Sequence, residues 1–109
     1  MKMQTDKLLT ALPFNEDGFL IEPNLWNRDI AQQIAYYDGL GQITKPQWQV
    51  LYYLREHYLD LQCIPPMGHL CHVLGQEKHC VEHLFHSEKE AWRVAGLPDP
   101  GGEAKTLMI

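Results

Sequence analysis

The chain reads Thr44-Lys45-Pro46-Gln47-Trp48-Gln49-Val50-Leu51 near its middle, and this stretch decides the fold. Thr44 and Gln47 have the spacing of a capping box, in which a hydroxyl at the helix start and an amide three residues later each bond the other's backbone. Pro46 is tolerated because a first-turn N–H has no partner within the helix. The side chains that follow recur at helical spacing and predict the core-facing side, with Arg55 reaching out at its edge: Trp48, Leu51, Tyr52, Arg55 and Leu59.

Similar signals on either side of this stretch predict further short helices. Asn27 suits an N-cap and precedes apolar residues at helical spacing, which predicts a helix from about residue 28 to 37. Pro65-Pro66 breaks the chain, and helices are expected over 67–74, with Gly75 at its end, and over 77–85. Ser87-Glu88-Lys89-Glu90 is a second capping box and opens a last helix that ends at Gly96.

The N-terminal part reads as a β-hairpin over residues 8–21, with turn residues at Asn15-Glu16-Asp17-Gly18 and an apolar run on each side. The predicted fold class is therefore mainly α, within the α+β type: an N-terminal β-hairpin packed on a bundle of about five short helices. The helix from Thr44, the Pro65-Pro66 turn and the helix 67–74 predict a helix-turn-helix-like corner. We expect a flexible N-terminus over 1–7, a single domain over 8–96 and a flexible C-terminal arm over 97–109.

Composition limits the possible functions. A chain of 109 residues with 45% apolar and 21% charged residues is ordinary for one globular domain. Its net charge of -5 disfavours nucleic acid as a partner, and no stretch approaches the roughly 20 apolar residues that cross a bilayer. We therefore expect a cytoplasmic protein, monomeric, whose three cysteines are free thiols.

The C-terminal sequence Ala95-Gly96-Leu97-Pro98-Asp99-Pro100 resembles the arm of the DsrC/TusE sulfur-relay family. The resemblance covers residues 17–102 and rests, in order, on Asp17-Gly18-Phe19-Leu20 with Trp26, Thr44-Lys45-Pro46-Gln47-Trp48-Gln49-Val50, Leu54-Arg55-Glu56-His57-Tyr58-Leu59, Pro65-Pro66 and Leu84-Phe85. It implies a protein of sulfur metabolism that has no cofactor. It also implies protein partners, either a dissimilatory sulfite reductase or the TusBCD complex and the tRNA 2-thiouridylase.

The sequence departs from the family where the family carries its reactive thiol. By the resemblance, the carrier cysteine of the arm corresponds to Glu103, and a second cysteine found in DsrC proper corresponds to Trp92. Glutamate cannot form a persulfide, because sulfur transfer needs a thiolate. The resemblance therefore implies a non-catalytic variant with a partner-binding arm made of Gly96, Leu97, Pro98, Pro100, Gly101, Gly102 and Glu103.

Other residues offer alternative functions. An active sulfurtransferase component would use a surrogate thiol, for which the candidates are Cys63, Cys71 and Cys80. A zinc site is a weaker alternative, because the plainer interpretation of the Cys/His-rich stretch is buried cysteines and surface histidines; its candidate ligands are His79, Cys80 and His83.

Two further features allow more than one interpretation. The helix 67–74 would be the recognition helix of a DNA-binding corner, but it carries His69 and His72 and no Lys or Arg, so we expect a packing corner. The terminus Thr106-Leu107-Met108-Ile109 is apolar. We expect a disordered tail there, with docking in a groove of this chain or of a partner as the alternative.

Overall fold

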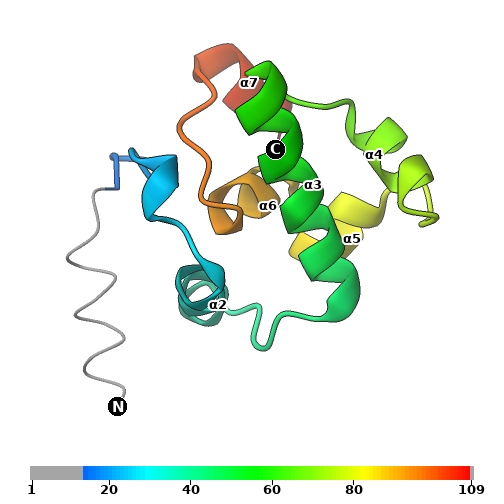
Figure 1. Cartoon of the computed structure of the whole chain (residues 1–109), viewed down its shortest axis with the longest axis horizontal. Helices are drawn as coiled ribbons and strands as arrows, with labels where there is room; N and C mark the ends of the chain where they lie inside the picture. Colours follow the sequence, from blue (N-terminus) through cyan, green and yellow to red (C-terminus); the bar gives the residue numbers. More distant parts are fainter. Residues whose placement is uncertain (1–13, 109) are drawn as a thin grey trace.

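The structure is a computed structural model that describes residues 14–108. Its elements are η1 (Pro23–Leu25), α2 (Arg28–Tyr37), α3 (Lys45–Leu61), α4 (Met67–Val73), α5 (Cys80–Phe85), α6 (Glu88–Val94) and α7 (Gly102–Leu107) (Figure 1). The mainly helical class is therefore confirmed. Within the described range, none of these helices has the length and apolar character needed to span a membrane.

Helix α3 begins as predicted. The Thr44 N–H donates to Gln47 Oε1 (2.8 Å), and the Gln47 N–H donates to Thr44 Oγ1 (3.4 Å), which completes the capping box. The Gln47 side chain also reaches across the core, where its Nε2 donates to the Leu84 carbonyl (2.7 Å). The start of the longest helix is thus tied to the end of α5.

The buried side of α3 differs from the predicted one. Its buried residues are Gln47, Val50, Leu51 and Leu54. Tyr52 and Leu59 are instead 40% and 46% exposed. Arg28 explains the position of Tyr52, because its guanidinium lies 4.1 Å above the Trp48 ring and donates to the Tyr52 hydroxyl (2.7 Å), so the two stacked rings pack at the surface.

The remaining helix starts follow their capping residues. Asn27 Oδ1 accepts from the Ile30 N–H (2.8 Å) at α2, as predicted. Ser87 Oγ accepts from the Glu90 N–H (3.0 Å) at α6, but the Glu90 carboxylate bonds Arg93 rather than closing the predicted capping box. Helix α5 starts later than predicted, at Cys80, because the residues before it form a turn.

The core is centred on α6, which packs against α2, α3 and α5 (Figure 1). The largest fully buried side chains come from three parts of the chain: Trp92 of α6, Phe19 of the N-terminal segment and Phe85 of α5. The arm that follows α6 therefore starts from the most buried helix of the molecule.

The predicted hairpin falls only partly within the described residues. Phe14 and Leu20 form an isolated antiparallel bridge, and Gly18, at φ 85°, closes the turn by donating its N–H to the Asn15 carbonyl (3.0 Å). No longer strand is present within residues 14–108. Residues 8–13 and the predicted flexible segment 1–7 lie outside the described residues, so the hairpin stays a prediction.

The C-terminal arm differs from the disordered tail that the sequence favoured. Residues Gly102–Leu107 form α7, and Met108 is only 3% exposed. The Met108 carbonyl accepts from the Lys89 N–H (3.4 Å), so the arm ends against α6. The tail docks on this chain, which was the alternative interpretation, because the methionine side chain reaches the core.

Candidate functional site

The arm leaves α6 at a glycine in the left-handed backbone region. Gly96 has a φ of 68°, and a Cβ at this position would lie 2.1 Å from Cδ1 of Trp26. The Trp26 indole N–H donates to the Val94 carbonyl (2.8 Å), which holds the ring against the turn. The predicted arm residue Gly96 therefore fixes the direction in which the arm departs.

Arg55 of α3 holds the same turn from the other side. Its Nη1 donates to the Ala95 carbonyl (2.9 Å), its Nη2 donates to the Pro23 carbonyl (3.0 Å), and its guanidinium lies 4.3 Å above the Trp26 ring. Burial lowers the pKa of Arg55 from its ordinary value, although a guanidinium remains charged at physiological pH. A cation at the carboxyl end of α6 also complements the dipole of that helix.

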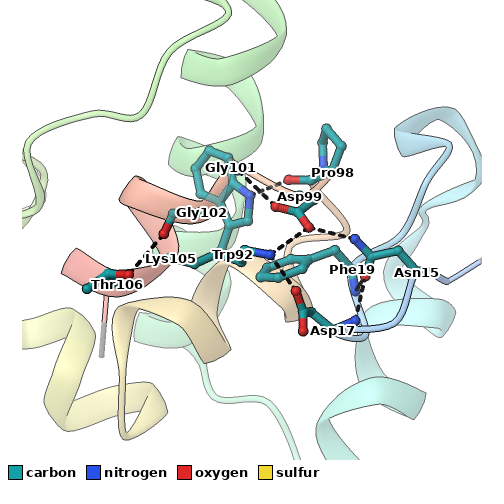
Figure 2. Close-up of polar contacts among 10 residues, drawn as sticks. All are labelled: Asn15, Asp17, Phe19, Trp92, Pro98, Asp99, Gly101, Gly102, Lys105 and Thr106. Carbon is teal, nitrogen blue, oxygen red and sulfur yellow. Dashed lines mark hydrogen bonds and ion pairs between the residues drawn. The ribbon is translucent and has the colours of Figure 1, made fainter.

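Trp92, which by the resemblance stands at a thiol position, ties the arm to α6. Its side chain is fully buried, and its Nε1–H donates to the Pro98 carbonyl (2.7 Å) (Figure 2). The Tyr58 ring packs edge-on against it, with ring centroids 5.4 Å apart. Leu97, between the two anchored positions, is also fully buried. The stem of the arm is therefore part of the core.

Asp99 connects the arm to the N-terminal segment (Figure 2). One carboxylate oxygen accepts from Asn15 Nδ2 (2.8 Å) and from Lys105 Nζ (3.0 Å), and the other accepts from the Gly101 N–H (2.8 Å). Lys105 Nζ also donates to Asp17. The Gly101 N–H, and then Lys105, lower the pKa of Asp99; Asp17, and then Asp99, raise the pKa of Lys105. Asp17 and Asp99 thus hold α7 through Lys105, and Asp99 is itself held by Asn15 and the Gly101 N–H.

The outer side of the arm faces solvent. Gly101, Gly102 and Glu103 are exposed, and Leu107 is 77% exposed. The other predicted arm residues, Pro98 and Pro100, are half-buried. The structure therefore separates the arm into a buried stem, an exposed tip around Glu103, and a docked end at Met108.

The cysteines differ from the predicted free thiols. Cys71 of α4 and Cys80 of α5 form a disulfide, with Cα atoms 5.8 Å apart. Both side chains are buried, and the two residues come together because α4 and α5 are joined by a short loop and pack against each other. Cys63 is free and exposed in the connection between α3 and α4, where its carbonyl lies 3.1 Å from His57 Nδ1.

The weak zinc candidates do not come together as a ligand set. The sulfur of Cys80 is bonded to Cys71, and His79 and His83 each pair with a carboxylate, Glu82 at 3.3 Å and Glu77 at 2.5 Å. Within residues 14–108, no group of three or more His, Cys, Asp or Glu side chains is arranged to hold a metal ion.

Sequence reasoning missed the residues that hold the arm in place. Lys105 and Asp17 are 88 positions apart, so no local pattern indicates their contact. The helical spacing predicts Arg55 at the edge of its helix, but a position seven residues after Trp48 does not indicate that Arg55 bonds carbonyls of two other segments. In the sequence, only the glycines and prolines of the stem indicated that an arm follows the last predicted helix.

The comparisons with known proteins agree on one family. The chain matches the family model described as DsrC like protein over residues 9–102, a match that ends just before Glu103. It is similar to the sulfurtransferase TusE homolog of Haemophilus influenzae, with 32% identity over 79% of this chain and 86% of that protein. Among solved structures, it is similar to the oxidized gamma-subunit of the dissimilatory sulfite reductase (DsrC) from Archaeoglobus fulgidus, with a TM-score of 0.71 and 28% identity over 84% of this chain and 90% of that one. The NMR structure of Allochromatium vinosum DsrC gives a TM-score of 0.68 and 30% identity over 84% and 88% of the two chains.

Proposed function

Because the chain belongs to the DsrC-like family, we propose that it binds a protein partner of sulfur metabolism without carrying sulfur on its arm. Its relatives are named sulfurtransferases and a subunit of dissimilatory sulfite reductase. The proposed partner is accordingly a sulfite reductase or a TusBCD-type complex in the cytoplasm. Binding without transfer makes the chain an accessory protein or a competitor of an active relative.

The exposed tip of the arm is the observation that carries this proposal. Glu103 lies in the first turn of α7, it is exposed, and residues 95–109 contain no cysteine. A carboxylate offers no sulfur atom to which sulfane sulfur can be attached. Leu107, 77% exposed, supports a binding role, because an exposed large apolar side chain gains free energy when a partner covers it.

The test measures binding and sulfur acceptance separately. The purified chain is titrated with dissimilatory sulfite reductase and with the TusBCD complex to measure binding. In parallel, the chain is incubated with a persulfide donor, and its mass is measured by intact-mass spectrometry. We expect binding to one complex and no sulfur on the arm. Leu107→Ser weakens the binding, whereas Thr106→Ala, an exposed neighbour, leaves it unchanged. Sulfur that loads onto the unmodified chain and passes to the partner would contradict the proposal.

A designed variant tests the assignment of position 103. Glu103→Cys places a thiol on the exposed first turn of α7, where a donor can reach it. We expect this variant to gain one sulfur atom from the persulfide donor, in a background in which Cys63 is replaced by Ser. Glu103→Gln, which removes the charge without adding a thiol, serves as the control and gains none.

The second candidate function is sulfur acceptance by Cys63. The observation in its favour is that this thiol is free and exposed, unlike Cys71 and Cys80. It lies on the domain rather than on the arm. If sulfur loads onto the unmodified chain and Cys63→Ser abolishes the loading while partner binding persists, the chain is an active sulfurtransferase component with a surrogate thiol.

A further inference from the structure

A cavity of about 500 Å³ lies where the arm meets α4 and α5. Its volume is in the range of small-molecule sites. The lining includes Met67 and Gly68 of α4, Val81 of α5, and Ala104 and Met108 of the arm. Exposed charged residues, Lys78 and Glu82, also line it, so the cavity connects to solvent.

The disulfide lies next to this cavity. Cys71 is among the residues that line the cavity, and its sulfur is bonded to Cys80. The two side chains are 0% and 2% exposed, so both sulfurs are covered while the arm is docked. Met108 belongs to the same cluster of buried side chains and lines the same cavity. The end of the arm and the disulfide therefore share one space.

We propose that the Cys71–Cys80 disulfide is a thiol–disulfide exchange site for a small thiol, and that the docked arm controls access to it. This site goes beyond partner binding and does not depend on which partner the chain binds. It differs from an arm thiol because both sulfurs belong to the domain.

The exchange takes place in two balanced steps. A small thiolate attacks Sγ of Cys71, the disulfide bond breaks, and Cys80 leaves as a thiolate that takes a proton from solvent. A second small thiolate attacks the small-molecule sulfur of the mixed disulfide, which releases Cys71 as a thiol and the small molecule as its own disulfide. Two thiols are oxidised, and the protein gains two electrons and two protons. The attack is placed at Cys71 because this residue is among those that line the cavity, whereas Cys80 is not.

Docking of the arm limits the rate of the first step. A thiolate must approach the disulfide along the S–S axis, and the docked structure leaves the Cys71 side chain no exposed surface. Met108 is the arm residue buried in this region, and Lys105 holds α7 through Asp17 and Asp99. Substitutions that weaken either contact therefore accelerate reduction.

The test follows reduction in the full chain with Cys63 replaced by Ser, so that only the pair remains. Air-oxidised protein is incubated with dithiothreitol, aliquots are alkylated with iodoacetamide, and the mass reports the number of free thiols. We expect reduction of the folded protein, at least about tenfold faster in Met108→Ala, the factor that ~1.4 kcal/mol of lost docking produces. Thr106→Ala, on the exposed side, reduces at the parent rate. Lys105→Ala also accelerates reduction, and this variant keeps the test informative if Met108→Ala fails to fold.

Single-thiol variants test which sulfur is attacked. With Cys63 replaced, Cys80→Ser leaves Cys71 as the only thiol, and Cys71→Ser leaves only Cys80. We expect a small disulfide reagent to label Cys71 in the folded protein and to label Cys80 only after unfolding. The proposal is overturned if air-oxidised folded protein has two free thiols, if the pair reduces only in denaturant, if Met108→Ala and Lys105→Ala both reduce at the parent rate, or if Cys80 labels before Cys71.

Discussion

Two features of the structure require glycine at position 96: a backbone in the left-handed region and a ring packed against the Cβ position. Its φ of 68° disfavours any L-residue with a Cβ, and the Cβ of an alanine would lie 2.1 Å from the Trp26 ring, which is itself fixed by its bond to Val94. We expect Gly96→Ala to lower the free energy of unfolding by about 2–4 kcal/mol, through backbone strain and overpacking together. Urea unfolding measures the loss. Gly102→Ala is the matched control, because nothing lies within 4 Å of its Cβ position; an equal loss in both variants would contradict the explanation.

Arg93 is shared by two carboxylates in a half-buried cluster. Its Nη1 lies 2.7 Å from Asp38 Oδ2 and 3.1 Å from Glu90 Oε1, and its Nε donates to the Gly18 carbonyl (3.1 Å). The second oxygen of Glu90 is buried without a hydrogen-bond partner among residues 14–108. Burial, and then the neighbouring Asp38, raise the pKa of Glu90 to about 8. A proton on Glu90 removes the charge from this buried carboxylate, and both burial and the neighbouring Asp38 favour that protonated form.

This cluster makes stability depend on pH. The pKa of Glu90 is 4.5 in the unfolded chain and about 8 in the fold, so the folded state binds the extra proton between these values. The free energy of unfolding therefore falls as pH rises from about 5 to about 8 and levels off above that. Glu90→Gln, which imitates the protonated acid, removes this decline. At pH 8.5 this variant is more stable than the parent by at least about 1 kcal/mol, because a shift of one pKa unit is worth ~1.4 kcal/mol. Urea unfolding at three pH values measures the effect. The exposed-site control Glu103→Gln keeps the decline of the parent chain. A decline that persists in Glu90→Gln would contradict the assignment to Glu90.

At the scale of elements, local signals predicted where helices begin better than which side they bury. Asn27, Thr44 and Ser87 accept the backbone N–H groups that their sequence positions indicate, because a cap depends only on residues three positions apart. The buried side of α3 depends instead on what packs against it. Tyr52 is drawn to the surface by Arg28, which comes from another helix.

The elements that the sequence did not indicate depend on distant partners. Helix α7 is six residues long, begins after a glycine and has no side-chain cap, so no local signal predicts it. It is held by Lys105 and Met108, whose partners lie in the N-terminal segment and the core. The disulfide was likewise missed, because composition indicated a reducing compartment and only the packing of α4 on α5 brings Cys71 to Cys80.

The disulfide is also a stabilising link between two short helices. Cys71 and Cys80 are nine positions apart, and a crosslink across such a loop reduces the entropy of the unfolded chain by an amount worth about 2–3 kcal/mol. We expect the free energy of unfolding of the oxidised Cys63→Ser chain to exceed that of its reduced form by this amount. Urea unfolding measures the difference, and the oxidised form should unfold at the higher urea concentration. Thiol counting by mass confirms the two states before each measurement. Coincident unfolding curves for verified oxidised and reduced protein would show that the crosslink contributes nothing.

At the scale of the whole molecule, the two ends of the described chain meet at one cation. Lys105 of α7 lies between Asp17 of the N-terminal segment and Asp99 of the stem, about 6.0 Å above the Phe19 ring (Figure 2). The stem is fixed independently by Gly96, Trp92 and Arg55, whose contacts do not involve Lys105. The molecule therefore has a rigidly anchored stem and an end that is held by the partly exposed charge contacts of Lys105 and by the buried side chain of Met108.

We expect Lys105→Ala to release α7 while the domain stays folded. The amide hydrogens of Gly102–Leu107 should exchange faster with solvent, whereas those of α3 and α6 should keep their protection, because local opening of α7 leaves the core contacts intact. Added salt should have the same effect on the parent chain, since these charge contacts are partly exposed. Hydrogen exchange followed by mass spectrometry resolves the segments, and Lys45→Ala, on an exposed lysine at the start of α3, is the control. If protection falls equally across all helices, the arm and the core open as one unit, and an arm that moves separately to admit a thiol or a partner is ruled out.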